Sequence, residues 1–319
     1  MKTTEIIKNC FKGSNPNYRS DIDGLRAQAC LAVVFYHAFP EYLKGGFIGV
    51  DILFVISKFL ISSILYKNLL NKDNPGAVNI VDFHIRRVRR IFPALIAVLI
   101  TCLVLGWFVL LPDEYKLLGN HVFGGSTYIS NFVLYKESGS YFNVESNANP
   151  LLHLWSLGVE EQFYIVFPLL LWLVYKLNLK FIIFLAVFTV LSFFLNKKGI
   201  KHGIQSYVFY MPWTIFWKSS AGAILAYAVM FYKDIVVVYK NKVENLLSKL
   251  FCREQKETKR IINNVISILG LALIVYGYVK ITNGFLKFPG KLALIPVCGA
   301  LLIIAAVKES VINKYILSS

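Results

Sequence analysis

Long apolar runs separated by short polar segments dominate the chain. Several of these runs reach or approach the roughly 20 residues that a helix needs to cross a bilayer. Because backbone polar groups in lipid must be hydrogen-bonded within their own segment, such runs fold as helices. The pattern therefore predicts an all-α fold, a polytopic transmembrane helical bundle that forms a single domain over residues 1–319. We place about eight membrane helices, at residues 25–43, 46–66, 91–111, 152–176, 178–195, 206–232, 262–282 and 290–307.

The segments between these runs predict how the chain crosses the membrane. Basic residues gather in 67–90 and 233–260, which the positive-inside rule places in the cytoplasm. Segment 112–150 holds more acidic than basic residues and is placed outside, so both termini are expected in the cytoplasm. The basic segment 197–202 falls outside in this arrangement, against the rule. The first 24 residues contain neither the apolar run nor the cleavage site of a signal peptide, so the first helix is expected to direct insertion.

Composition supports membrane residence and limits the classes of partner. Of 319 residues, 56% are hydrophobic and 16% are charged, against roughly 25% charged in soluble domains. The net charge of +16 comes from basic segments beside apolar runs, where topology and anionic membrane lipid account for it, so no nucleic acid partner is expected. The five cysteines are widely separated and show neither a metal-ligand spacing nor a disulfide framework, so no metal is expected.

Arg26 and His37 are the candidate catalytic residues of the first membrane helix. They are separated by eleven positions, which is close to three helical turns and roughly 16 Å of rise, so they share a face. A donor with a charged head could dock at Arg26 while its reactive end approaches His37. The imidazole could then accept a hydroxyl proton or carry the acyl group itself. The alternative is a topogenic arginine and a histidine that hydrogen-bonds within the bundle.

Asp51 begins the second helix, close to the outer surface, after a stretch that contains three glycines. A short outer turn would return this helix beside the first one. Asp51 is therefore expected either to orient the charged form of His37 or to cap the helix N-terminus, where the helix dipole favours an acid.

An arginine cluster precedes the third helix and lies on its cytoplasmic side. Guanidinium forks recognise phosphate oxygens, so Arg86, Arg87 and Arg90 are candidate binding residues for a phosphorylated donor such as an acyl-coenzyme A. The alternative is charge that sets the topology and contacts lipid headgroups.

The start of the fourth helix carries polar side chains at three- and four-residue spacings, which share one face: His153, Ser156, Glu160 and Tyr164. The adjacent Glu160 and Glu161 lie near the outer leaflet, where carboxylates are costly unless they are paired or face a cavity. With the indole of Trp155, these groups suit a cleft that binds a sugar hydroxyl and orients an imidazolium. The alternative is a helix that begins in the polar interface.

The motifs that contain these residues resemble those of acyltransferase family 3, inner-membrane acyltransferases that include O-antigen, peptidoglycan and exopolysaccharide O-acetylases. The similarity begins in segment 18–26, whose Arg26 is followed after ten residues by His37. It continues in the family's order along much of the chain, through 45–57, 86–95, 149–164 and 288–296. Several ordered motifs make this resemblance specific.

The resemblance implies transfer of an acetyl or other short acyl group to a hydroxyl of a cell-envelope polysaccharide, such as lipopolysaccharide O-antigen, or of a lipid-linked sugar, at the bacterial inner membrane. Cytoplasmic acetyl-CoA or another acyl-CoA would be a co-substrate, and no bound cofactor is implied. His37 would be the catalytic residue with Arg26 as its partner, and the arginine cluster would bind the donor. The other residues expected at the site are the catalytic Asp51 and Glu160 and the acceptor-binding Ser57, Trp155 and Tyr164.

The chain also departs from the family pattern. Lys58 stands where the family usually has glycine, and a charge in an apolar helix costs about 2.5–3.5 kcal/mol on insertion scales. Ile215 and Lys218 stand where the family has arginine and glutamate, so a charge pair is expected to be lost. The sequence ends at Ser319, before the family's last helices and without the hydrolase-like domain of some members. These departures favour an alternative, an inactive truncated remnant or a partner subunit. A transporter would require inverted repeats or broken paired helices, which the sequence does not show.

Overall fold

The protein is helical throughout the part that the structure describes. The computed structural model describes residues 18–69, 80–138, 149–177, 180–232, 255–282, 288–306 and 308–318, and no strand occurs among them. This confirms the predicted all-α fold. The helices are α2 (Ser20–Ala38), α3 (Gly49–Leu69), α4 (Ile80–Val109), α5 (Pro112–Ser126), α6 (Ser130–Ser138), α7 (Leu154–Lys176), α8 (Phe181–Lys201), α9 (Gln205–Tyr210), α10 (Pro212–Phe231), α12 (Gln255–Lys280) and α13 (Leu294–Ala305), with short turns η1 (Gly46–Ile48), η3 (Lys291–Ala293) and η4 (Asn313–Leu317).

Within the described residues, six helices are long and apolar enough to cross a membrane, so the protein is a multi-pass membrane protein. Two further membrane helices predicted from the sequence correspond to α2 and α13. Helix α13 is shorter, and α2 carries Asp21, Asp23 and Arg26 in its first two turns. The six spans are Gly46–Asn68, Val81–Val109, Leu154–Lys176, Phe181–Lys201, Pro212–Phe231 and Glu257–Lys280.

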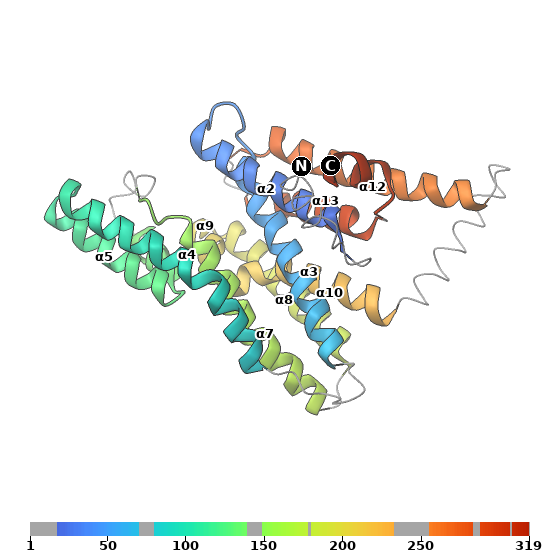
Figure 1. Ribbon diagram of the computed structural model, residues 1–319, viewed down its shortest axis with the longest axis horizontal. Helices are drawn as coiled ribbons and strands as arrows, with labels where there is room; N and C mark the ends of the chain where they lie inside the picture. Colours follow the sequence, from blue (N-terminus) through green and yellow to red (C-terminus); the bar gives the residue numbers. More distant parts are fainter. Residues whose placement is uncertain are drawn as a thin grey trace, which may run out of the picture.

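Helix α3 lies at the centre of the bundle and packs against α10, α2 and α13 (Figure 1). Two glycines permit the close contacts. A Cβ atom on Gly222 of α10 would lie 2.3 Å from the Val55 carbonyl oxygen of α3. A Cβ atom on Gly49 of α3 would lie 2.4 Å from the Ala29 carbonyl oxygen of α2. Small residues allow helix backbones to approach closely where lipid provides no hydrophobic driving force between helices. The glycine-bearing motif before Asp51 therefore fixes α3 against α2.

The helix predicted at residues 206–232 is instead two helices, α9 and α10. Met211 between them is extended, with φ −79° and ψ 130°. Pro212 causes the break, because a proline ring disfavours helical backbone at the preceding residue and suits the first position of a new helix. The Met211 carbonyl oxygen accepts a hydrogen bond from Thr214 Oγ1 at 2.7 Å. The break turns the chain beside the start of α7.

Helix α4 begins at Ile80 rather than near residue 91, so the arginine cluster is helical. Asp82 in the first turn stabilises the helix by its interaction with the positive end of the helix dipole. No glycine or proline interrupts the helix before Pro93. Segment 112–150, predicted as an outer loop, contains α5 and α6. Pro112 is well placed to start α5, and Glu114 accepts a hydrogen bond from the Leu111 N–H at 2.9 Å.

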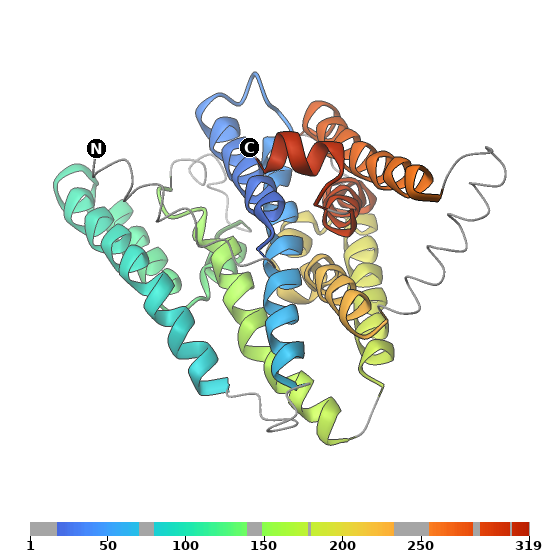
Figure 2. The same cartoon turned by 45° about the vertical axis from the view of Figure 1, so that its right-hand side comes forward.

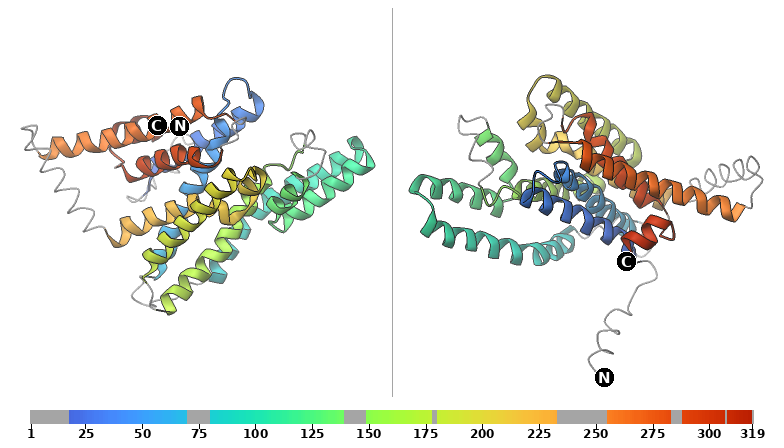
Figure 3. Two further views of the ribbon diagram at one scale, coloured as in Figure 1. Left: turned by 180° about the vertical axis from the view of Figure 1, so that it is seen from behind. Right: turned by 90° about the horizontal axis from the view of Figure 1, so that it is seen from above.

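Helices α4 and α5 lie side by side at one edge of the bundle (Figure 2). Helices α12 and α13 pack together on the far side of α3 from α4 and α5 (Figure 3). The groups discussed below lie between these two edges, where α2, α3, α7 and α10 meet.

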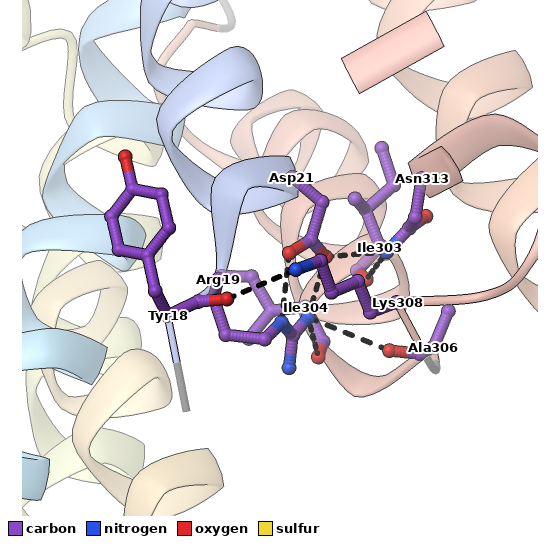
Figure 4. Close-up of polar contacts among 8 residues, drawn as sticks. All are labelled: Tyr18, Arg19, Asp21, Ile303, Ile304, Ala306, Lys308 and Asn313. Carbon is purple, nitrogen blue, oxygen red and sulfur yellow. Dashed lines mark hydrogen bonds and ion pairs between the residues drawn. The ribbon is translucent and has the colours of Figure 1, made fainter. Parts of the chain in front are cut away.

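The first family motif holds the C-terminal segment against α2 (Figure 4). Buried Asp21 accepts hydrogen bonds from Arg19 at 2.7 and 2.8 Å and from Asn313 Nδ2 at 2.8 Å. Although burial opposes ionisation, these donors and the Arg19 charge lower the pKa of the Asp21 carboxyl. A Cβ atom on Gly24 would lie 1.8 Å from the Leu317 carbonyl oxygen. This part of the motif is therefore a structural clamp.

Candidate active site

Helix α2 carries both Arg26 and His37, as the sequence predicts. Arg26 Nη1 donates a hydrogen bond to Asp23 Oδ1 at 2.8 Å. The side chains of Arg26 and Asp23 are 35% and 41% accessible to solvent. His37 lies in the last turn of α2 and is exposed. Ligands can therefore reach both Arg26 and His37.

The ring of His37 contacts a second imidazole. His37 and His153 have ring centroids 4.4 Å apart and an interplanar angle of 71°, an edge-to-face arrangement. The Tyr36 ring lies on another side of His37, at a centroid distance of 5.0 Å. His153 immediately precedes α7, and its partial burial lowers the pKa of the imidazole. The contact joins the outer ends of α2 and α7 as the predicted topology orients them.

Trp155 lies two residues after His153, in an aromatic cluster. Its ring centroid is 4.6 Å from that of Phe209, 6.0 Å from that of Tyr210 and 6.3 Å from that of Phe54. These partners come from α9 and α3, so the break at Pro212 brings two of the rings to α7. The half-buried indole offers an aromatic face close to the histidine pair.

Glu160 is at the centre of a polar cluster inside the bundle. The fully buried Lys58 Nζ of α3 lies 3.6 Å from Glu160 Oε1 and 3.4 Å from the Glu160 carbonyl oxygen. The Tyr164 hydroxyl donates a hydrogen bond to the same carboxylate, which the Ser57 hydroxyl also contacts. Lys58 Nζ lies 3.6 Å from the Tyr164 ring centroid, within cation–π range. Ser57, Glu160 and Tyr164, predicted as site residues, therefore come together, and Lys58 is paired within the bundle.

The arginine cluster divides into two parts. Arg87 donates hydrogen bonds to the Glu161 carboxylate, and its guanidinium carbon lies 3.4 Å from the Tyr164 ring centroid. This contact ties α4 to α7. Arg86 and Arg90 are exposed on α4. Of the three predicted donor-binding residues, Arg87 is thus engaged with Glu161, and the other two are accessible.

Asp51 pairs with Lys218, one of the residues that depart from the family pattern. Lys218 Nζ of α10 donates to Asp51 Oδ1 at 2.6 Å, and both side chains are buried. Asp51 lies in the first turn of α3, where the helix dipole also favours it. The family's arginine–glutamate pair at positions 215 and 218 is absent, and Lys218 pairs with Asp51 instead. Ile215 is buried among apolar side chains of the core.

Sequence reasoning missed the partners of Lys58 and Lys218, although a signal was present. A charge inside the membrane requires a partner of opposite sign. The second, fourth and sixth predicted membrane helices contain two interior lysines, Lys58 and Lys218, and three acids, Asp51, Glu160 and Glu161. Their opposite charges could have predicted that each lysine pairs with an acid, but which acid each one contacts depends on tertiary packing.

The polar groups form a strip along α7. From His153 to Glu160 the chain advances seven residues, which is roughly 10 Å of helix rise. The His37–His153 pair lies at the exposed end of the strip, and the Glu160 carboxylate with its hydrogen bond from Tyr164 lies deeper. This arrangement suits proton transfer from a hydroxyl to an imidazole. Among the described residues, no group of three or more His, Cys, Asp or Glu side chains could hold a metal ion.

Comparison with known families gives one match that spans most of the chain. The model of a family described as an acyltransferase domain matches residues 19–311. The matched region runs from the Arg19 clamp to the segment that the clamp holds, and it contains the histidine pair, the Glu160 cluster and the arginine cluster.

Two curated proteins of Staphylococcus aureus illustrate the similarity. The protein named "Putative O-acetyltransferase SAS0844" of strain MSSA476 is 39% identical over 166 residues, which cover 51% of this chain and 26% of the relative. The O-acetyltransferase OatA of strain NCTC 8325 is 35% identical over 169 residues, or 53% of this chain and 27% of the relative. The part of the chain that aligns with these two relatives thus covers about a quarter of their length. No solved structure matches the chain.

Proposed function

Because the chain belongs to the acyltransferase domain family, we propose that it is an O-acyltransferase that moves an acetyl or other short acyl group from acyl-CoA to a hydroxyl of a cell-envelope polysaccharide. One observation carries this proposal beyond the family. An exposed imidazole, His37, stands on the same helix as Arg26 and in ring contact with His153 at the start of α7. The relatives named as O-acetyltransferases support acetyl as the transferred group.

The proposed reaction forms an ester at the expense of a thioester. The acceptor hydroxyl oxygen attacks the thioester carbonyl carbon while His37 takes the hydroxyl proton. The C–S bond breaks, and coenzyme A leaves as a thiolate that takes up a proton. In the alternative route, the His37 nitrogen attacks first and carries the acyl group as an acyl-imidazole before the hydroxyl attacks. An exposed ring at the end of α2 serves either route.

The donor is proposed to bind at the accessible arginines of α4. The guanidinium groups of Arg86 and Arg90 are exposed and could hold the phosphates of coenzyme A. Arg87 would act indirectly, because its contact with Glu161 fixes α4 against α7. Arg26 would hold a charged part of the donor on the way to His37.

The acceptor is proposed to bind against the start of α7. The face of Trp155 suits the apolar face of a sugar ring. Glu160, Tyr164 and Ser57 form one hydrogen-bonded set that could receive sugar hydroxyls. Lipopolysaccharide O-antigen and a lipid-linked sugar both fit this description, at a bacterial inner membrane with both termini in the cytoplasm.

An inactive remnant or a partner subunit is the competing proposal. This proposal is motivated by the departures from the family pattern at Lys58, Ile215 and Lys218. The contacts that these residues make in the structure argue against it. Both lysines have carboxylate partners, and Ile215 is packed in the core. Two buried charge pairs between different helices are not expected to persist in a sequence that is losing its function.

The test is glycan O-acetylation in a host that lacks this activity. We expect the wild-type chain to add acyl esters and His37→Ala to lower their amount by about 100-fold or more, because general base catalysis contributes about 10²–10⁴-fold. His202→Ala is the matched control, since this exposed histidine follows α8. Mass spectrometry of the glycans and an immunoblot of the membranes give the amount per protein. Undiminished acylation by His37→Ala would remove His37 as the catalyst.

A further inference from the structure

The contact between His37 and His153 joins two distant parts of the chain. Their ring centroids are 4.4 Å apart in an edge-to-face arrangement, near the lower end of the distances typical of aromatic pairs, about 4.5–7 Å. The two residues lie 116 positions apart in the sequence, on segments that belong to different helices. Both side chains are exposed, so the pair faces the space from which substrates would approach.

The surroundings leave the two imidazoles to act on each other. Among the described residues, no carboxylate, ammonium or guanidinium group forms an ion pair or hydrogen bond with either ring. Tyr36 supplies the other ring that contacts His37. Asp51, which the sequence placed near His37 as a possible orienting group, is held by Lys218 instead. A catalytic histidine normally has a partner that fixes its ring, and here the group in that position is His153.

We propose that His153 is the positioning residue for His37, holding its ring and stabilising the imidazolium that forms when His37 accepts the proton of the acceptor hydroxyl. A neutral imidazole can do this through a nitrogen lone pair, which a phenyl ring lacks. The inference rests on the proposed function, because it assigns a partner to the proposed catalyst.

The chemistry of the pair limits it to one proton. Two imidazolium rings at this separation would repel each other strongly, so protonation of one ring favours the neutral form of the other. Partial burial lowers the pKa of both imidazoles, and the charge of a protonated His153 would lower that of His37 further. In this proposal His37 gains the proton of the acceptor hydroxyl, and a nitrogen of the neutral His153 ring stabilises the new cation.

A purely structural role for His153 makes a different prediction from a positioning role. Phenylalanine at this site keeps an aromatic ring and the edge-to-face contact but has no nitrogen. Glutamine keeps a hydrogen-bond donor and an acceptor but loses the ring. If His153 only packs α2 against α7, His153→Phe should be as active as the wild type. If it acts on the protonated ring of His37, His153→Phe should be the slower of the two variants.

The experiment uses membrane vesicles from a host lacking O-acetylation, with the host's own envelope glycan as the acceptor. Acetyl-CoA is varied, and release of the coenzyme A thiol gives kcat and KM per amount of folded protein. We expect His153→Phe to lower kcat by about 10–100-fold while KM for acetyl-CoA stays within about twofold of the wild type. His153→Gln should recover part of the loss, and added imidazole should raise the rate of His153→Gly.

The outcomes separate this inference from the proposed function. A wild-type rate for His153→Phe, together with an inactive His37→Ala, would overturn the role of His153 alone. An active His37→Ala would overturn the proposed catalyst and with it the pair. An equal loss in His153→Phe, His153→Gln and His153→Gly without rescue by imidazole, at normal protein level, would show that the loss does not come from the missing ring nitrogens and would also overturn the inference. If His153→Phe fails to insert, the comparison of His153→Gln with the imidazole-treated His153→Gly decides the question.

Discussion

Removing one member of the buried pair Asp51–Lys218 should destabilise the protein strongly, whereas removing both should not. Lys218 Nζ and Asp51 Oδ1 are 2.6 Å apart, a distance at which unit charges attract by about 6 kcal/mol at an effective dielectric constant near 20. Desolvation of both groups offsets most of this attraction. Asp51→Asn or Lys218→Met alone leaves an uncompensated buried charge, which costs about 3–5 kcal/mol.

The double variant tests whether the two charges act on each other. Asp51→Asn with Lys218→Met removes the attraction and both desolvation costs together. Its stability should therefore lie close to that of the wild type, far from the sum of the two single losses. Lys280→Met is the matched control, because this lysine is exposed at the end of α12, and its removal should change the stability by less than about 0.5 kcal/mol.

Thermal unfolding of the purified protein in detergent, followed by tryptophan fluorescence, measures these effects. We expect both single variants to melt several degrees below the wild type and the double variant to recover most of the loss. Additive effects, or single variants as stable as the control, would refute the pairing. The double variant also separates stability from catalysis, because a well-folded but inactive double variant would show that activity requires the charge pair itself.

Three further predictions concern other contacts. Lys58→Met should destabilise the bundle by about 3 kcal/mol, and adding Glu160→Gln should restore part of the melting temperature; failure of the second change to help would contradict their pairing. Arg86→Gln combined with Arg90→Gln should raise KM for acetyl-CoA at least tenfold with little change in kcat, and an unchanged KM would exclude them from the donor site. Gly222→Leu should prevent the close contact of α10 with α3 and lower the amount of folded protein in membranes, whereas a normal amount would show that the contact can widen.

The helices were largely predictable, because apolar length and hydrogen bonding in lipid dictate them. Errors arose where a local signal was overlooked. Pro212 divides a predicted helix, and the helix-compatible sequence from Ile80 onward extends α4 through the arginine cluster. The short helices α5 and α6 of segment 112–150 were not predicted, because polar residues interrupt its apolar positions. In all three cases the prediction gave too little weight to the local helix propensity of the sequence.

The partners within the site were less predictable, because they depend on packing between distant segments. Lys218 meets an acid 167 residues away, and Lys58 meets Glu160 at a separation of 102 residues. The motif residues themselves could be named in advance from the resemblance to the family. That resemblance did not show that Arg87 binds Glu161 or that His37 contacts His153, since a motif records residue types and not their partners.

The most direct test of the central claim is acyl transfer by the purified chain. The wild-type protein and His37→Ala are reconstituted into lipid vesicles with envelope glycan as the acceptor, and acetyl-CoA labelled with ¹³C in the acetyl group is added. Mass spectrometry then detects labelled esters on the glycan. The account predicts labelled O-acetyl groups with the wild type and none above background with His37→Ala. Labelled glycan in equal amount from both proteins, or from neither at normal folded yield, would contradict it.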